Sequence, residues 1–350
     1  MTSISNSVLD TIGNTPLIRL HNIEKGSKHQ FFAKVEYFNP GGSIKDRIAY
    51  YMIEAAEKRG ELKPGGTIVE ATAGNTGMGL ALVAAVKGYK CIFVLPEKMS
   101  AEKRAMLRAY GAKVVITPNG LEPEDPLSHY SVARRIAEST ENCFLANQYH
   151  NMDNMDYHYK VTGPEIWNQT QGEIDMFVAG VGTGGTLSGV AKYLKEKKPS
   201  VKVVCTDPVG SILFDLFKHG KVLEKPTPWK VEGVGEDMLP DNCQLKLYDD
   251  FIRVTDKEAF TLARRLVVEE GLCVGPSSGL ILAGAIKYAQ EHLDKPSKIV
   301  AVMPDSGKAY LSKLFNDEWM VENGLLDKSE IKQAFNVEIK AEEELKNRNA

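Results

Sequence analysis

The stretch Asn39-Pro40-Gly41-Gly42-Ser43-Ile44-Lys45-Asp46-Arg47 stands between a predicted strand and a predicted helix. An apolar run with helical spacing follows it, so we expect a helix to begin here, with Ser43 and Asp46 forming a capping box. Lys45 would then lie in the first turn, where the positive end of the helix dipole favours a neutral, nucleophilic amine. A lysine that carries a cofactor is one interpretation of this stretch, and a solvated lysine at a helix start is the other.

Length and composition indicate a protein that acts on small molecules. The chain has 350 residues, enough for two domains, with 43% hydrophobic residues, 25% charged residues and a formal net charge of -3. A weakly negative chain offers no basic field for nucleic acid, and no apolar run approaches the roughly 20 residues of a membrane span. We therefore expect neither nucleic acid nor a membrane as a partner.

The cysteines predict a reducing compartment. All five lack Cys-x-x-Cys spacing, and most stand in apolar or strand-like runs: Cys91, Cys143, Cys205, Cys243 and Cys273. Such a distribution favours reduced core residues over a disulfide frame or a metal site. The N-terminus also lacks the pattern of a signal peptide, so the sequence predicts a cytoplasmic protein without a metal.

Strands and helices alternate along the chain. Short apolar runs predict strands at residues 31–36, 67–70, 91–95, 113–117, 143–146, 174–179, 201–206, 251–255 and 298–303. Longer runs with helical spacing predict helices at residues 78–87, 101–110, 128–140, 159–169, 187–197, 257–270 and 280–292, and a long loop reaches residue 249. This alternation predicts two α/β units with mostly parallel sheets covered by helices.

A first loop between a strand and a helix is suited to binding a carboxylate. It contains Thr72, Gly74, Asn75 and Thr76. Its backbone amides can hold a carboxylate at the helix N-terminus, and the Asn75 amide can donate to a ring oxygen. A simple helix cap explains this loop equally well.

A second glycine-rich loop favours a phosphate. Its small residues, Gly182, Thr183, Gly184, Gly185 and Thr186, leave backbone amides and two hydroxyls free to surround a dianion. With Gly180 the loop also satisfies G-x-G-x-x-G, and Asp207 follows where a dinucleotide site places its ribose carboxylate. That interpretation, a nicotinamide oxidoreductase, explains neither the lysine stretch nor the Asn75 loop.

A third loop contains Ser277, whose hydroxyl can face a ring nitrogen without adding charge, although a helix cap is the alternative. Taken together, a lysine amine, an asparagine amide, a phosphate loop and a serine are the groups needed to hold pyridoxal phosphate. A protein that binds this ligand without turnover remains a further alternative.

Two further motifs accompany these loops: the opening Gly13-Asn14-Thr15-Pro16-Leu17 and the later Pro304-Asp305-Ser306. Together the motifs follow one another in the order found in a known enzyme family. In them the chain resembles the fold-type II, or β-family, of pyridoxal phosphate enzymes, from residue 12 to about residue 326. The resemblance implies a large cofactor-binding domain of residues 1–45 and 150–330, and a smaller mobile domain of residues 46–149 that binds the substrate carboxylate. The active site would lie in the cleft between them, and residues 331–350 would form a C-terminal tail.

The same resemblance implies roles for individual residues. Lys45 would form the Schiff base with pyridoxal phosphate, Asn75 would meet the ring hydroxyl, residues 182–186 would surround the phosphate, and Ser277 would meet the ring nitrogen. The substrate carboxylate would be bound by Thr72, Gly74, Thr76 and Gln148. Ala73 stands where the family commonly has serine, which leaves the choice of substrate open.

Three further stretches make the chain most similar to family members that join serine to homocysteine: Asn147-Gln148-Tyr149-His150-Asn151, Val231-Glu232-Gly233-Val234-Gly235 and Asp317-Glu318-Trp319-Met320. The resemblance implies β-replacement, in which L-serine or O-acetylserine is condensed with L-homocysteine by a homodimer. The alternatives are O-acetylserine with sulfide, and release of sulfide from cysteine. We hypothesise that Glu236 receives the homocysteine ammonium group, a solvated loop glutamate being the alternative.

Overall fold

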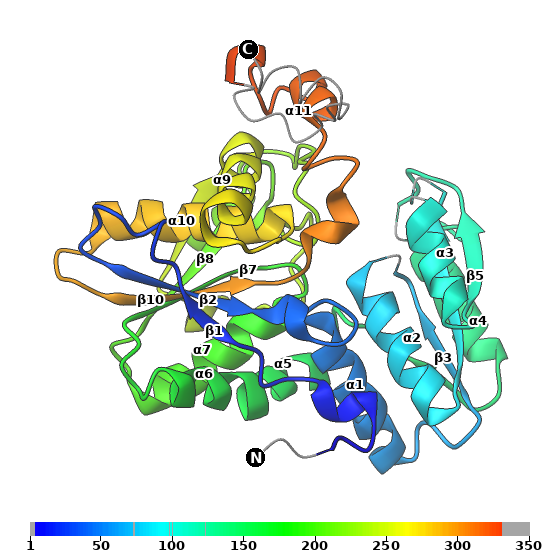
Figure 1. Ribbon diagram of the computed structural model, residues 1–350. Coiled ribbons are helices and arrows are strands. Elements are labelled where there is room, and N and C mark those ends of the chain that lie inside the picture. Colours follow the sequence, from blue (N-terminus) through cyan, green and yellow to red (C-terminus); the bar gives the residue numbers. More distant parts are fainter. Residues whose placement is uncertain (1–3, 73, 98, 100, 123, 331–350) are drawn as a thin grey trace, which may run out of the picture.

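The structure is a computed structural model that describes residues 4–330, except residues 73, 98, 100 and 123. Within this part of the chain the strands form two separate sheets, one of six strands and one of four, each accompanied by its own helices (Figure 1). This confirms the predicted α/β fold with two mostly parallel sheets. The tail expected at residues 331–350 lies outside the described residues.

The six-stranded sheet gathers strands from both ends of the described chain. Its strands, in spatial order, are β1 (Leu17–Arg19), β2 (Gln30–Val35), β10 (Lys298–Met303), β7 (Met176–Gly180), β8 (Lys202–Pro208) and β9 (Asp250–Val254). Only β1 pairs antiparallel; the other neighbours run parallel. Parallel strands are joined by crossover helices, so both faces of this sheet are covered and most residues of the inner strands β10, β7 and β8 are buried.

Helices cover both faces of the six-stranded sheet. On one face lie α9 (Asp256–Glu270) and α10 (Pro276–His292), and on the other α5 (Asp153–Tyr157), α6 (Gly163–Gln169) and α7 (Gly185–Lys197) (Figure 1). Two short helices, α8 (Leu213–His219) and α11 (Asp317–Glu322), complete this unit. A single large cluster of buried side chains fills the space between sheet and helices.

The four-stranded sheet is built from one continuous part of the chain. Its spatial order is β5 (Lys113–Thr117), β4 (Lys90–Pro96), β3 (Thr67–Glu70) and β6 (Cys143–Leu145), all parallel. Around it lie α1 (Lys45–Arg59), α2 (Asn75–Lys87), α3 (Ala101–Ala109) and α4 (His129–Ser139). Separate apolar clusters form on the two faces of this sheet.

The predicted elements are largely present, and the differences concern helix starts. Strands β3, β5 and β10 have the predicted bounds, whereas α2, α7 and α10 each begin two to four residues earlier than expected. These first turns are rich in Gly, Ser, Thr and Pro, which interrupt the apolar spacing although they suit a helix N-terminus. The expected long loop to residue 249 is wrong in part, because it contains α8.

Candidate functional site

Lys45 is the first residue of α1, but the helix is not capped in the predicted way. Ile44 is the N-cap, the Ser43 hydroxyl accepts from the Lys45 N–H at 3.2 Å, and the Asp46 carboxylate accepts from the Gly41 N–H at 2.6 Å. The predicted capping box is therefore wrong, because the helix starts one residue too late for Ser43 to be its N-cap. Gly41 is required here, since a Cβ would lie 2.5 Å from Asp46 Oδ1.

The backbone before Lys45 is held against the end of the six-stranded sheet. The Ile44 N–H donates to the Pro304 carbonyl at 2.9 Å, and Ser43 forms an antiparallel bridge with Asp305. The lysine stretch therefore runs along the carboxyl end of β10, where parallel sheets commonly bind ligands.

A buried network of charged side chains holds the first turn of α1 in place. Arg47 Nε donates to Glu36 Oε2 at 2.6 Å and Nη1 to Glu165 Oε2 at 2.9 Å, and Lys34 Nζ reaches Glu165 Oε1 at 2.5 Å. The side chains of Arg47 and Glu36 are fully buried. Burial alone would raise the pKa of Glu36, but Arg47 lowers it, so the pair is ionised. This network joins α1 to β2 and α6.

The surroundings of Lys45 favour its neutral amine. Burial lowers the pKa of Lys45 below its ordinary value of 10.5, while the nearby carboxyls of Asp305 and Glu236 act in the opposite direction. The net shift increases the fraction of neutral amine at neutral pH, which is the form that attacks a carbonyl.

One cavity joins Lys45 to the glycine-rich loop after β7. Its lining includes Lys45, Gly182, Thr183, Gly184 and Thr186, with Val234 and Ile281 supplying apolar walls. The structure thus brings together two of the regions that the sequence singled out. The first N–H groups of α7, which begins at Gly185, have no acceptor within the helix and are available to an anion.

The glycines of this loop are required by close packing. A Cβ at Gly182 would lie 2.5 Å from the Gly233 carbonyl, one at Gly184 2.6 Å from the Cys243 backbone, and one at Gly185 2.0 Å from Asn154 Oδ1. The loop is pressed against other segments and leaves no room for larger residues. This favours a rigid phosphate cradle over a flexible linker.

The sequence analysis missed two side chains that hold the hydroxyls of this loop. Asn154 Nδ2 donates to Thr183 Oγ1 at 2.9 Å, and His158 Nε2 lies 3.1 Å from Thr186 Oγ1. Burial, together with the charge of Arg47, lowers the pKa of His158 well below its usual value, so the ring is neutral. Both residues precede the helix predicted at residues 159–169; in the structure Asn154 lies in α5 and His158 begins a π-helical turn, His158–Thr162, so the sequence contained no signal for either.

Asn75 and Ser277 approach the same segment after β10. Asn75 begins α2, and its Nδ2 donates to Asp305 Oδ2 at 2.8 Å. Ser277 is buried in the first turn of α10, and Gly275, just before that turn, donates its N–H to the Asp305 carbonyl at 3.1 Å. Asp305 therefore links the stretches that carry Lys45, Asn75 and Ser277, while residues 182–184 and Thr186 meet Lys45 at the cavity.

The residues predicted at a substrate carboxylate form two pairs. Thr76 Oγ1 donates to Gln148 Oε1 at 2.5 Å, joining the start of α2 to the segment after β6. The Gly74 N–H donates to Thr72 Oγ1 at 3.3 Å. Ala73 lies outside the described residues.

Glu236 lies beside the glycine-rich loop of residues 182–186. A Cβ at Gly182 would be 3.9 Å from Glu236 Oε1. Burial, then the charge of Asp237, raises the pKa of Glu236 to about 8, although a hydrogen bond with Tyr149 opposes the shift. Glu236 is therefore mostly protonated at neutral pH, and it is a partly buried residue rather than a freely solvated one.

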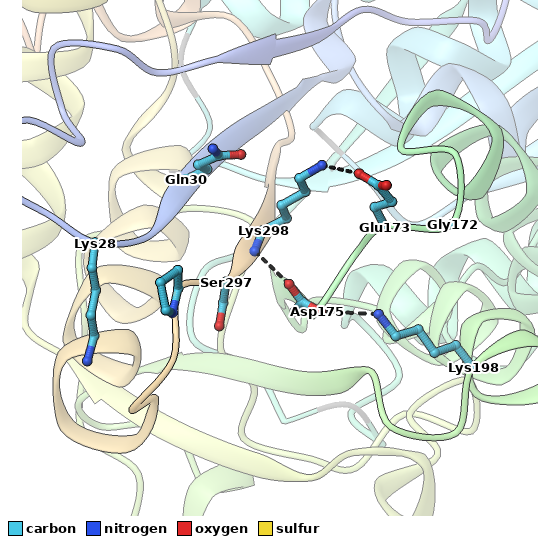
Figure 2. Close-up of a pocket in the computed structure, with 9 residues that line it drawn as sticks. Lys28, Gln30, Gly172, Glu173, Asp175, Lys198, Ser297 and Lys298 are labelled. Atoms are coloured by element: carbon cyan, nitrogen blue, oxygen red, sulfur yellow. Dashed lines mark hydrogen bonds and ion pairs between the residues drawn. The ribbon is translucent and has the colours of Figure 1, made fainter.

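A second pocket, of about 410 Å³, lies at the opposite end of the strands (Figure 2). Its lysines already have partners: Lys298 pairs with Glu173, Lys198 pairs with Asp175 at 3.1 Å, and Lys28 donates to the Asp294 carbonyl at 2.8 Å. None of the predicted site residues lines it, so the Lys45 cavity remains the candidate site.

The described residues hold no group of three or more His, Cys, Asp or Glu side chains arranged for a metal ion. All five cysteines are free. Among residues 4–330, outside the four omitted positions, no helix is long and apolar enough to cross a membrane. The donor set of the Lys45 cavity, an amine with a lowered pKa beside a glycine-rich loop with free N–H groups, fits an organic phosphate that carries an aldehyde.

Comparison with known proteins supports this interpretation. The family model for pyridoxal-phosphate dependent enzymes matches residues 8–305. A cystathionine beta-synthase from Oryctolagus cuniculus is 46% identical over 93% of this chain and 59% of its own length. One from Saccharomyces cerevisiae is 44% identical over 92% of this chain and 65% of its own length. The chain thus spans about three fifths of the curated relatives that it matches.

Two solved structures share the fold. A hydrogen sulfide-producing enzyme from Fusobacterium nucleatum is 38% identical, with a TM-score of 0.81 over 88% of this chain and 98% of that one. A cysteine synthase from Entamoeba histolytica is 35% identical, with a TM-score of 0.81 over 89% and 90% of the two chains. The family match, the shared fold and the Lys45 cavity lead to one conclusion: this chain belongs to the pyridoxal-phosphate dependent enzymes.

Proposed function

We propose that this chain catalyses β-replacement, condensing L-serine or O-acetylserine with L-homocysteine to give L-cystathionine. The observation that carries the proposal is the cavity in which Lys45 faces the anion-binding loop of residues 182–186. The identity of 46% with a cystathionine beta-synthase over 93% of this chain supports the choice of reaction.

We propose that pyridoxal phosphate is held by Lys45 at its aldehyde carbon, by Asn75 at its ring hydroxyl and by Ser277 at its ring nitrogen. Gly182, Thr183, Gly184, Gly185 and Thr186 would bind its phosphate through backbone amides and hydroxyls. When bound, this cofactor supplies an electron sink that acidifies the α-hydrogen of an amino acid. The neutral Ser277 hydroxyl would leave the pyridine ring less electron-demanding than a carboxylate partner would.

The Lys45 amine would move the protons. As a general base it takes the α-proton of the first substrate, whose β-hydroxyl or acetoxy group leaves as water or acetate. As a general acid it returns the proton to the α-carbon after the thiol, having lost its own proton, has added to the β-carbon. Its lowered pKa leaves a larger fraction of the amine unprotonated and able to accept a proton. The backbone that carries this amine is fixed, because the Ile44 N–H donates to the carbonyl of Pro304, the residue after β10.

The first substrate would be held by its carboxylate at Thr72, Gly74, Thr76 and Gln148. Thr76 donates its hydroxyl hydrogen to Gln148 Oε1 in this structure, so this hydroxyl would turn to the substrate carboxylate while the Gln148 NH₂ group donates beside it. We propose that residues 46–149 move as the smaller domain against residues 1–45 and 150–330. Closure would exclude water while the β-carbon is reactive and so limit hydrolysis.

The second substrate would be recognised by Glu236. It lies close enough to Lys45 for its charge to act on that amine, and its pKa of about 8 means that an arriving ammonium group must displace a proton from it. Homocysteine carries such an ammonium group and sulfide does not, so Glu236 would favour homocysteine as the acceptor.

The alternatives are synthesis of cysteine from O-acetylserine and sulfide, and release of sulfide from cysteine. They are favoured by the two solved structures, whose names describe those activities and whose folds match most of this chain. We further propose that the enzyme is a cytoplasmic homodimer; the five free cysteines support a reducing compartment.

Spectroscopy on the purified protein tests the proposal. We expect a visible absorbance band from the lysine-bound cofactor that shifts when serine is added and recovers with homocysteine but not with sulfide. A band that responds only to O-acetylserine and recovers with sulfide would establish the cysteine synthase alternative. Protein saturated with pyridoxal phosphate that shows no band would contradict the whole proposal.

A further inference from the structure

Asp305 connects segments that are distant in the sequence, and no step of the proposed reaction uses its side chain. Its Oδ2 accepts from Asn75 Nδ2 at 2.8 Å and from the Tyr310 hydroxyl at 2.7 Å. Its backbone bridges to Ser43 and accepts from Gly275. Only 3% of the residue is exposed. The carboxyl therefore stands between the stretches that carry Lys45, Asn75 and Ser277.

The site around the carboxyl leaves little freedom. A Cβ at Gly275 would lie 2.2 Å from Asp305 Oδ1, so only glycine permits this approach. Oδ1 itself has no hydrogen-bond partner among the described residues. A buried carboxyl that is kept with one oxygen unpaired costs free energy, which suggests that the retained group has a role beyond packing.

The chemistry of the two side chains points to that role. Burial raises the pKa of the Asp305 carboxyl, while its hydrogen bonds with Tyr310 and Asn75 oppose the shift. In both of these hydrogen bonds Oδ2 is the acceptor, so it binds the NH₂ end of the Asn75 amide. Nδ2 carries two hydrogens, and with one donated to Asp305 the other remains. The Asn75 amide therefore cannot rotate so that Oδ1 takes the place of Nδ2, because Oδ1 would then face the accepting oxygen of Asp305.

We propose that Asp305 is a positioning residue that fixes the orientation of the Asn75 amide, so that its second N–H is presented to the ring hydroxyl oxygen of pyridoxal phosphate. This inference rests on the proposed function, because it assumes that Asn75 meets the cofactor ring. Tyr310 contacts the same oxygen but does not restrain Asn75, and it provides a matched control.

The test measures binding of pyridoxine 5′-phosphate to the cofactor-free protein. This compound has the ring hydroxyl and the phosphate but no aldehyde, so its affinity does not depend on a bond to Lys45. It is titrated against the wild type, Asn75→Ala, Asp305→Asn, Tyr310→Phe and the double variant Asn75→Ala with Asp305→Asn. Thermal unfolding of each protein checks that it is folded.

We expect Asn75→Ala to weaken binding roughly tenfold, the effect of one lost hydrogen bond, and Asp305→Asn to weaken it about threefold to tenfold. The double variant should bind no more weakly than Asn75→Ala within about twofold, because Asp305 acts through Asn75. Tyr310→Phe should remain within about twofold of the wild type, since the bond to Asn75 is kept. If Asp305→Asn does not fold, Asp305→Ser, which is smaller and cannot collide with Gly275, takes its place.

Two results would overturn this inference without affecting the proposed function. One is wild-type affinity for pyridoxine 5′-phosphate in Asp305→Asn. The other is a loss of affinity in the double variant equal to the product of the two single losses, which would show that Asp305 is merely structural. Unchanged binding in Asn75→Ala would remove the proposed contact of Asn75 and the inference with it. A wild-type protein that binds neither pyridoxine 5′-phosphate nor pyridoxal phosphate would overturn the proposed function itself.

Discussion

Lys45 and Lys58 stand near opposite ends of helix α1 and differ in their surroundings. Lys45 faces the cavity with a lowered pKa, whereas the Lys58 side chain is 75% exposed. We expect Lys45→Ala to lower kcat for cystathionine formation about 10³-fold or more, since it removes the general base, and to abolish the visible band. Lys58→Ala should leave both unchanged. Steady-state kinetics and absorbance spectra measure the effects, and near-normal turnover in Lys45→Ala would contradict the assignment.

The pKa of Glu236 leads to a pH-dependent acceptor affinity. Below about pH 8 its carboxyl is mostly protonated, and above that it is a carboxylate that attracts an ammonium group. The KM for homocysteine should therefore fall as the pH rises from 7 to 8.5. In Glu236→Gln the KM should be higher, and this part of its pH dependence should be lost.

Ionisation of the homocysteine thiol is common to the wild type and the Glu236→Gln variant, so the difference between the two profiles isolates Glu236. Parallel profiles, or a normal homocysteine affinity in Glu236→Ala, would leave Glu236 without this role.

Which single residues could be predicted depended on local chemistry. Lys45, Asn75 and residues 182–186 stand in loops whose composition indicates a ligand, and the structure brings them together. Asp305 and His158 act through contacts made across the fold, with Asn75 and Thr186 respectively. Patterns of neighbouring residues in the sequence do not reveal contacts between distant segments, so no role was predicted for these two residues.

At the scale of the secondary-structure elements, α1 depends on the buried network of Arg47, Glu36 and Glu165. Removing one member leaves a buried charge unpaired, which costs about 3–5 kcal/mol. We expect Arg47→Met to lower the free energy of unfolding in urea by this amount. Arg59→Met, at the exposed end of α1, should lower it by less than about 1 kcal/mol. Equal effects of the two substitutions would show that the network contributes little.

Helix α8 shows why one element escaped prediction. It has only seven residues within a long stretch of loop composition, too few for a clear helical period. Its start is held by the buried Asp207, whose Oδ2 accepts from the Phe214 N–H at 3.0 Å. The sequence had offered Asp207 as a ribose ligand of a dinucleotide site, and the structure instead uses it as a helix cap.

For the molecule as a whole, Glu232 connects the two sheet units. Its carboxylate meets Lys103 of α3 at 2.5 Å and Lys313 at 2.7 Å. We expect Glu232→Gln to increase deuterium uptake in α3, because the four-stranded unit is then less firmly held to the six-stranded one. Glu61→Gln, whose ion pair with Arg59 does not reach α3, should leave this uptake unchanged.

High salt should reduce the difference between the wild type and Glu232→Gln, since the ion pairs are partly exposed. Equal uptake in the two proteins at low salt would mean that Glu232 does not restrain the units.

The order of strands in the six-stranded sheet has a consequence for synthesis of the chain. Strand β2 pairs in parallel with β10, so Gln30 cannot form its strand pair until Lys298 has been synthesised. Residues 67–145, by contrast, contain every strand of the other sheet. The four-stranded sheet can assemble while translation continues; the larger one cannot be completed before residue 303 has emerged. Lys45 is thus synthesised early, but the segment after β10 that packs beside it is synthesised late. We expect the nascent chain to bind its cofactor only after β10 has joined the sheet.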